Sequence, residues 1–299
     1  MKPIHLMLAL LIGINSYPSW SLAQDSKFDP SRVKWKSLSY KTHVLFFGMN
    51  IEVQMNQISL ATSKAALLEP KSGQGTVPQT DPTYRLDLDT KILGRNSAIS
   101  LWFDPDGCAF QRTQTDTGKK HRVKTYRILE NGYYSLQAKP RENEKELAPN
   151  MWTDRGEGEN KFNKLPPAGM VISEPTALYY LASASPLNKP GDEFEQYIFT
   201  KHGIYQLNFR AVDYQNLEVQ FEINHSGESE TVYDDEYETL HIKMNGVPID
   251  ASAEGDFDLL GLKGEIDLYL DPKTRVLLQI SGSLDIIGYT DIKLKAVTF

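Results

Sequence analysis

The chain has 299 residues and 40% of them are apolar, so it can bury a sizeable core in one large domain or two small ones. Its formal net charge of -7 gives no general attraction to nucleic acid or to an anionic membrane surface, because both require clustered lysine and arginine. The single cysteine, Cys108, excludes an internal disulfide, so stability must come from burial and hydrogen bonding.

The first 23 residues have the pattern of a secretory signal peptide. Lys2 gives a positive start, the apolar run LMLALLIGI follows at 6–14, and Ser21 and Ala23 are small residues before a cut near Gln24. The apolar run is shorter than the ~20 residues that a membrane-spanning helix needs. We therefore expect cleavage near Gln24, export to the periplasm, and no transmembrane segment after removal of the signal.

Most of the remaining chain has the pattern of short β-strands. The turn sequences at 104–107 and 131–132 separate neighbouring strand-like runs and favour hairpins. Regularly spaced strands with such turns predict a mainly β fold, either a curved antiparallel sheet or a partly open, lipocalin-like β-barrel. The runs lie at about 40–60, 84–92, 98–103, 108–114, 121–128, 133–138, 194–200, 205–210, 217–223, 239–244, 264–270, 275–281 and 283–297.

Residues 139–170 interrupt this rhythm. The segment is rich in Pro, Glu, Asn and Gly and lacks two-residue alternation, so it predicts a long surface crossing. The β-rich domain at 24–299 would then have two halves, at about 38–138 and 171–299.

One short helix is predicted directly after the crossing. Ser173 is expected to cap its N-terminus, with Pro175 in the first turn. Ala177, Leu178 and Leu181 have helical spacing, so their common face should pack on the sheet.

The sequence lacks the common catalytic and metal-binding motifs. It has no Gly-rich phosphate loop, no GxSxG and no HExxH, and its histidines lack metal-ligand spacing. We therefore expect no metal and no cofactor, and a non-catalytic role is favoured over an enzymatic one.

Adjacent aromatic pairs provide the candidate ligand-binding side chains. Neighbouring strand residues face opposite sides of a sheet, so one member of a pair can point outward or into a cavity. The candidates are Trp102, Tyr134 and Tyr180, although core packing is the commoner role of such residues.

Three further features favour ordinary structural roles. GKKHRVK at 118–124, which includes His121, is expected to form a basic, solvated edge. Glu228–Glu238 has six carboxylates but no EF-hand spacing, and predicts a solvated hairpin loop rather than a Ca²⁺ site. Cys108 is expected to be a small, buried core residue.

Four segments resemble, in their order, a family of exported bacterial proteins. They are HVLFFGMNIEV, WFDPDGCAFQRTQTDTGKKHRVKTYRI, EPTALYYLASASPLNKPGDEF and GEIDLYLDPKTRVLLQISGSLDIIGYTDIKLKAV. The family is catalogued as domain of unknown function 3108, and the resemblance covers about 38–299. It implies an envelope location and a lipocalin-like sheet around a helix, and supplies no catalytic residues. The stretches 139–170 and 228–238 depart from the family pattern.

Three functions remain open at this point. The first is a non-catalytic periplasmic protein that binds an apolar small molecule, a lipid or another envelope component. The second is an envelope assembly or scaffold protein that binds another protein. The third is a carbohydrate-active enzyme or glycan-binding module. A large apolar cavity favours the first, an exposed apolar patch the second, and a groove with exposed aromatics and two carboxylates the third.

Overall fold

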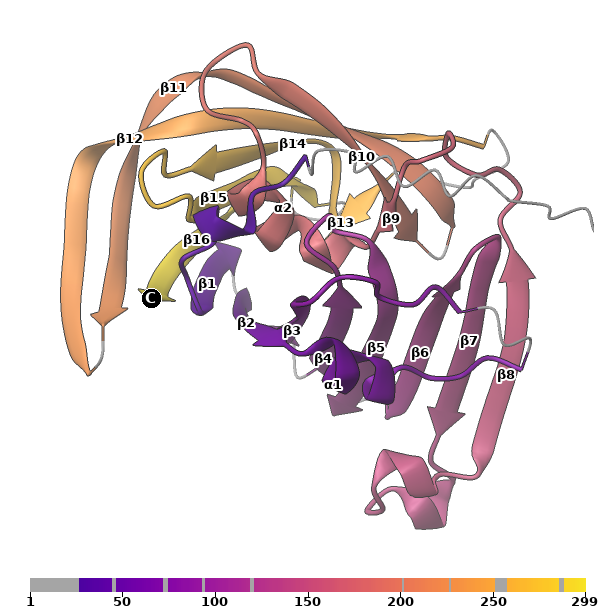
Figure 1. Cartoon of the computed structure of the whole chain (residues 1–299). Coiled ribbons are helices and arrows are strands. Elements are labelled where there is room, and N and C mark those ends of the chain that lie inside the picture. Colours follow the sequence, from indigo (N-terminus) through magenta and orange to yellow (C-terminus); the bar gives the residue numbers. More distant parts are fainter. Residues whose placement is uncertain are drawn as a thin grey trace, which may run out of the picture.

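The computed structural model describes residues 27–44, 47–71, 75–92, 95–118, 121–200, 202–225, 227–250, 257–284 and 288–299. Strands make up 62% of the structure and helices 10%. This confirms the predicted mainly β fold, which is built on one large, curved sheet (Figure 1). The predicted signal peptide at 1–23 and its cleavage site lie outside the described residues.

The first half of the sheet is an antiparallel meander of eight strands in chain order. The turns predicted at 104–107 and 131–132 are confirmed, since each separates two adjacent strands. In the first turn, the Asp104 carboxylate accepts hydrogen bonds from the N–H groups of Asp106 and Cys108, and Gly107 has a φ of 77° that favours glycine. The strands are β1 (Ser37–Val44), β2 (Phe47–Ile58), β3 (Thr83–Ile92), β4 (Arg95–Phe103), β5 (Ala109–Gly118), β6 (Arg122–Leu129), β7 (Gly132–Lys139) and β8 (Asp154–Lys161).

The sequence predicted a surface crossing without strands at 139–170, but the structure has a strand there. The segment contains β8, which pairs antiparallel with β7, and two 3-10 turns, η2 (Glu142–Glu144) and η3 (Pro149–Met151). The prediction was wrong at β8 because nearly all of its side chains are exposed, so the strand has no buried face that would impose apolar alternation. Its glycines and charges are typical of an edge strand that resists further pairing.

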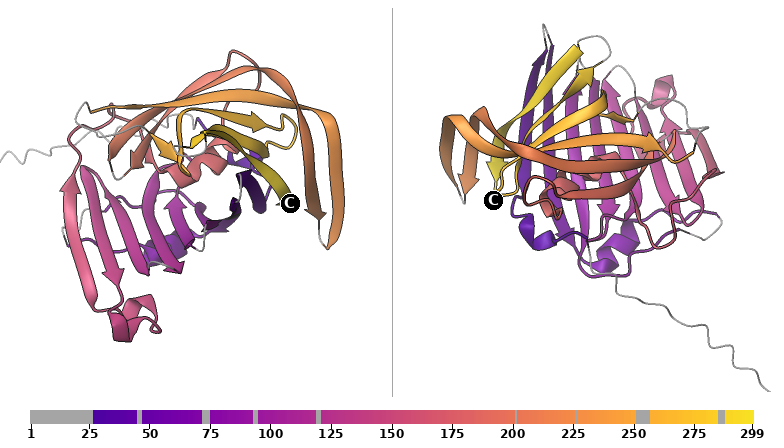
Figure 2. Two further views of the ribbon diagram at one scale, coloured as in Figure 1. Left: turned by 180° about the vertical axis from the view of Figure 1, so that it is seen from behind. Right: turned by 90° about the horizontal axis from the view of Figure 1, so that it is seen from above.

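The second half of the sheet joins the first through the β1–β16 ladder, which pairs the first strand with the last. Figures 1 and 2 show the two halves curving towards each other, with the helix α2 between them. The strands of this half are β9 (Ile172–Ser173), β10 (Glu193–Thr200), β11 (Gly203–His225), β12 (Glu228–Pro248), β13 (Asp258–Leu259), β14 (Leu262–Leu270), β15 (Leu277–Leu284) and β16 (Gly288–Thr298).

The β11–β12 hairpin is far longer than its neighbours and bends over the sheet (Figure 1). Its outer part, described at 216–225 and 227–238, is here called the arch. At the end of the arch β11 pairs in parallel with β16, at Glu222–Asn224 and Ala296–Thr298, and so closes a ring of β11, β12, β14, β15 and β16. The acidic stretch Glu228–Glu238 is therefore part of a strand rather than a loop, although its side chains are largely exposed, as expected.

The predicted short helix lies between the halves. It is α2 (Leu178–Ala184), entered through the 3-10 turn η4 (Pro175–Ala177), and all of its residues are buried. Tyr180 packs against Phe103 with ring centroids 4.9 Å apart. The other helical segments are α1 (Leu60–Ala66) and the 3-10 turn η1 (Pro30–Arg32).

The expected Ser173 cap is wrong. Ser173 belongs to β9, and its buried hydroxyl has no partner among the described residues. Glu174 takes the capping role instead, because its carboxylate accepts a hydrogen bond from the Thr176 N–H at 2.7 Å. The chain enters the helix through a 3-10 turn, which moves the capping position one residue along.

Candidate functional site

A cleft of about 660 Å³ lies between the two halves of the sheet, beside the N-terminal end of α2. We call it the interhalf cleft. Strands β3 to β6 form one wall, and the β10–β11 turn together with residues 257–263 forms the other. Its lining residues are Leu88, Ile99, Arg112, Gln114, Arg122, Lys124, Tyr126, Glu174, Pro175, Thr176, Tyr179, Phe199, Thr200, His202, Tyr205, Phe257, Asp258, Leu259, Leu260 and Lys263.

The first wall changes from apolar to polar across the sheet. Directly paired residues on adjacent strands share a face, and one such row runs Leu88, Ile99, Gln114, Lys124. Strands β3 and β4 thus give apolar side chains to the concave face, whereas β5 and β6 give polar ones. Polar residues at positions that face the interior are typical of functional sites.

The charged groups of the cleft are mostly cationic. Its lining has four lysine or arginine residues but only two carboxylates, in a chain whose net charge is -7. The Nε of Arg112 lies 2.8 Å from Oε1 of Glu174. Arg122 is hydrogen-bonded to Asp116 just outside the lining. Burial alone would raise the pKa of Asp116, but its hydrogen bonds with Arg122, Gln114 and Ser97 lower it overall.

One buried donor in the cleft, the Tyr179 hydroxyl, lacks a hydrogen-bond acceptor among the described residues. Arg112 lies beside it in the lining and has Glu174 as its counter-charge. Burial raises the pKa of Tyr179 far above its usual value, so its hydroxyl is a neutral donor. A buried donor without an acceptor costs about 1–3 kcal/mol, which makes the Tyr179 hydroxyl suited to an incoming acceptor.

Aromatic side chains form the apolar part of the cleft. Phe199 packs against Tyr126 with ring centroids 5.9 Å apart, and Tyr205 packs against Phe257 at the same centroid distance. Behind them, the space around Leu178 and Leu181 has no room for a water molecule. Within the described residues, α2 therefore fills the deep interior that a lipocalin-like barrel would leave open.

The sequence candidates Trp102 and Tyr134 lie on the opposite face of the sheet. They belong to the cross-strand row Trp102, Gln111, Arg127, Tyr134. The chain around Leu68 covers this outer face, where the Leu68 N–H donates to the Gln111 side chain at 2.7 Å. The Tyr134 hydroxyl donates to Glu157.

The third candidate, Tyr180, is a core residue. It is fully buried, and its hydroxyl donates to the carbonyl of Pro105 at 2.6 Å. The structure therefore does not bring Trp102, Tyr134 and Tyr180 together, and none of them lines the interhalf cleft.

The sequence interpretation missed the basic side chains of β6. GKKHRVK was expected to be a solvated edge, but Arg122 to Lys124 begin a strand that lies between β5 and β7. The signal that could have found them is alternation: Arg122, Lys124 and Tyr126 share one face, and that face contributes to the cleft.

Cys108 is half-buried rather than fully buried. Burial, with smaller contributions from the charges of Asp104 and Asp106, raises the pKa of its thiol well above the usual value. The thiol is therefore protonated and a poor nucleophile at neutral pH.

The described residues contain no group of three or more His, Cys, Asp or Glu side chains that could hold a metal ion. They also contain no helix that is long and apolar enough to cross a membrane.

Comparison with known proteins gives no relative. The chain matches no family model, no curated protein and no solved structure. The resemblance to the family of domain of unknown function 3108 therefore stays a prediction.

Proposed function

We propose that this chain is a non-catalytic binding protein whose interhalf cleft takes an amphipathic ligand with an anionic head group. The observation that carries the proposal is the buried Tyr179 hydroxyl, which has no acceptor among the described residues and lines the same cleft as Arg112. An anionic oxygen accepts hydrogen bonds from a phenol and from a guanidinium, and charge-assisted bonds are the stronger kind.

The two parts of the cleft match the two parts of such a ligand. The basic side chains of β5 and β6 suit the head group, whereas Phe199, Tyr205 and Phe257 suit an apolar body. The volume of about 660 Å³ is that of a small-molecule site. The proposed location is the periplasm, on the strength of the signal-peptide pattern at 1–23, and N-terminal sequencing of exported protein tests it.

The cleft proposal is tested by titrating the protein with dodecyl phosphate, dodecyl maltoside and inorganic phosphate in a calorimeter. Dodecyl phosphate should bind at least tenfold more tightly than either of the others, because only dodecyl phosphate has both an anionic head group and an apolar chain. Arg112→Gln should weaken its binding about tenfold, equivalent to ~1.4 kcal/mol, and Tyr179→Phe should weaken it severalfold.

Lys161→Gln on the exposed edge strand β8 is the matched control and should leave binding unchanged. Equal affinities for dodecyl phosphate and dodecyl maltoside would contradict the proposal that the ligand has an anionic head group. Equal affinities of the parent and Arg112→Gln for dodecyl phosphate would contradict the proposal that it binds in the interhalf cleft.

A further inference from the structure

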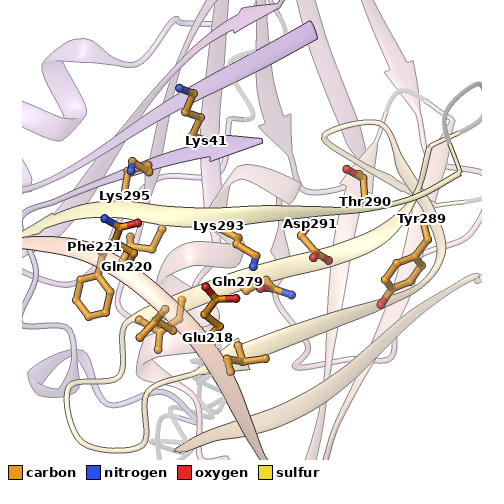
Figure 3. A pocket seen from close by; sticks show the side chains of 14 residues that line it. Lys41, Glu218, Gln220, Phe221, Gln279, Tyr289, Thr290, Asp291, Lys293 and Lys295 are labelled. Atoms are coloured by element: carbon orange, nitrogen blue, oxygen red, sulfur yellow. The ribbon is translucent and has the colours of Figure 1, made fainter. Parts of the chain in front are cut away.

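A second hollow, of about 540 Å³, lies under the arch, and we call it the arch groove. It forms where β16 changes partners: β15 pairs with β16 as far as Gln279 and Lys293, and β11 takes its place from Ala296 onward. Figure 3 shows Lys293, Lys295 and Asp291 on β16, Lys41 on β1, and Glu218 and Gln220 on β11. The groove is separate from the interhalf cleft, and the two share no lining residue.

Three lysines line this groove beside two carboxylates, Glu218 and Asp291, so its lining has an excess of one positive charge. Lys41 and Lys293 are directly opposite each other in the β1–β16 ladder, an arrangement that is unfavourable for like charges. Lys295 adds a third cation, at the register shift beside Tyr40. Within the described ranges, none of these three ammonium groups lies within 4.0 Å of a carboxylate. The unbalanced charge favours an anion in the groove.

The other side chains are suited to hydroxyl groups and to a ring face. Tyr289 is 60% exposed, and its hydroxyl donates to Asp267 at 2.7 Å, which holds the phenol ring at one end of the groove. Gln279 donates to the Ser281 hydroxyl, and that hydroxyl donates to Asp291. These bonds hold an amide and a carboxylate in place along the groove before any ligand enters.

The arch limits the size of the anion. Residues 216–238 contain eight carboxylates and no lysine or arginine. A long polyanion such as nucleic acid would be repelled by this surface, whereas a short ligand can reach the lysines without running along the arch.

We propose that the arch groove binds a short acidic oligosaccharide. Its carboxylates or phosphates would meet Lys41, Lys293 and Lys295, its hydroxyls would hydrogen-bond to Gln279 and Asp291, and one sugar ring would lie on Tyr289. This site is independent of the ligand proposed for the interhalf cleft.

Titration with four probes tests the proposal: trigalacturonate, which has carboxylates, glucose 6-phosphate, maltotriose as the neutral saccharide, and inorganic phosphate. Trigalacturonate or glucose 6-phosphate should bind at least tenfold more tightly than both maltotriose and inorganic phosphate. The affinity should fall severalfold between 50 and 500 mM NaCl, because exposed charges are screened by salt.

Two variants locate the site. Lys293→Gln should weaken binding of the acidic saccharide about tenfold, and Tyr289→Ala should weaken it severalfold. Tyr233→Ala removes an equally exposed tyrosine from the arch, outside the groove lining, and Lys124→Gln removes a cation of the interhalf cleft. Both should bind as the parent does, with all folds checked by circular dichroism.

Three outcomes would overturn the proposal. They are the absence of binding by both acidic saccharides, inorganic phosphate that binds as tightly as they do, and full affinity in both Lys293→Gln and Tyr289→Ala. None of them bears on dodecyl phosphate in the interhalf cleft, so the two proposals can fail separately.

Discussion

The Nε of Arg112 lies 2.8 Å from Oε1 of Glu174, and this ion pair joins the two halves of the molecule. Arg112 comes from β5 in the first half, and Glu174 comes from the turn that enters α2 in the second. Both side chains are largely buried, so the pair is sensitive to the loss of either partner.

Glu174→Gln should separate the structural role of this pair from the binding role of the cleft. The amide oxygen can still accept from the Thr176 N–H, but the Arg112 cation loses its counter-charge. We expect the free energy of unfolding to fall by ~1–3 kcal/mol and the affinity for dodecyl phosphate to rise severalfold. Urea unfolding and calorimetric titration measure both, and a variant with weaker anion binding would contradict the cationic role of Arg112.

Arg275 should be essential to the end of α2. Its guanidinium donates to the carbonyls of Ala182, Ser183 and Ser185, and to that of Leu187 just beyond the helix. Burial lowers the pKa of Arg275 to about 10, which still leaves it charged at neutral pH.

Arg275→Lys should lower the free energy of unfolding by ~2–4 kcal/mol, because one ammonium cannot reach all four carbonyls and leaves buried acceptors without partners. Urea unfolding provides the measurement. Lys273→Arg, at an exposed position of the same turn, is the control and should change stability little. Equal stability of the parent and Arg275→Lys would show that the guanidinium does not support the helix.

Leu181→Ala tests whether α2 builds the core. Leu181 is fully buried, and its side chain lies so close to Gly107 that a Cβ there would approach it to 2.8 Å. Truncating the Leu181 side chain should lower the free energy of unfolding by ~2–5 kcal/mol, because apolar contacts are lost and a cavity is left behind. Urea unfolding measures this loss, and Leu147→Ala, at a side chain that is 40% exposed, should lower the free energy of unfolding far less. If the two variants are equally stable, the helix is not part of the core.

Asp104 should make stability depend on pH. Burial raises the pKa of its carboxyl to about 6, with the hydrogen bond from the Cys108 N–H opposing the shift. The folded chain therefore keeps a proton that the unfolded chain releases above its ordinary pKa of 3.8, so the contribution of Asp104 to stability falls as pH rises from ~4 to ~6.

Asp104→Asn removes this titration, and its side-chain oxygen can still accept the same N–H bonds. The free energy of unfolding of this variant should exceed that of the parent by ~1–3 kcal/mol at pH 7.5 and by much less at pH 4. Urea unfolding at the two pH values checks this, with Asp154→Asn on β8 as an exposed control. A gain that is the same at both pH values would contradict the raised pKa.

The second half shows where local patterns mislead. Residues 205–210 and 217–223 look like separate strands, but both lie in β11, because its two register shifts bend the strand without ending it. Residues 283–297 look like one strand, yet Ser283 pairs with Tyr289 across a hairpin. Gly288, with a φ of 82°, is a local sign that the chain reverses before β16.

The sequence by itself determined the β class, the Asp104–Gly107 and Asn131–Gly132 turns, and a short apolar helix after residue 173, because each depends on neighbouring residues. Only the tertiary structure decided which face of β5 and β6 is concave, and thus that Arg112 and Lys124 line a cleft while Trp102 and Tyr134 lie behind it. Alternation places residues on two faces of a strand but does not say which face is inside. That choice follows from the twist of the whole sheet, the pairing of β1 with β16, and the position of α2 between the halves.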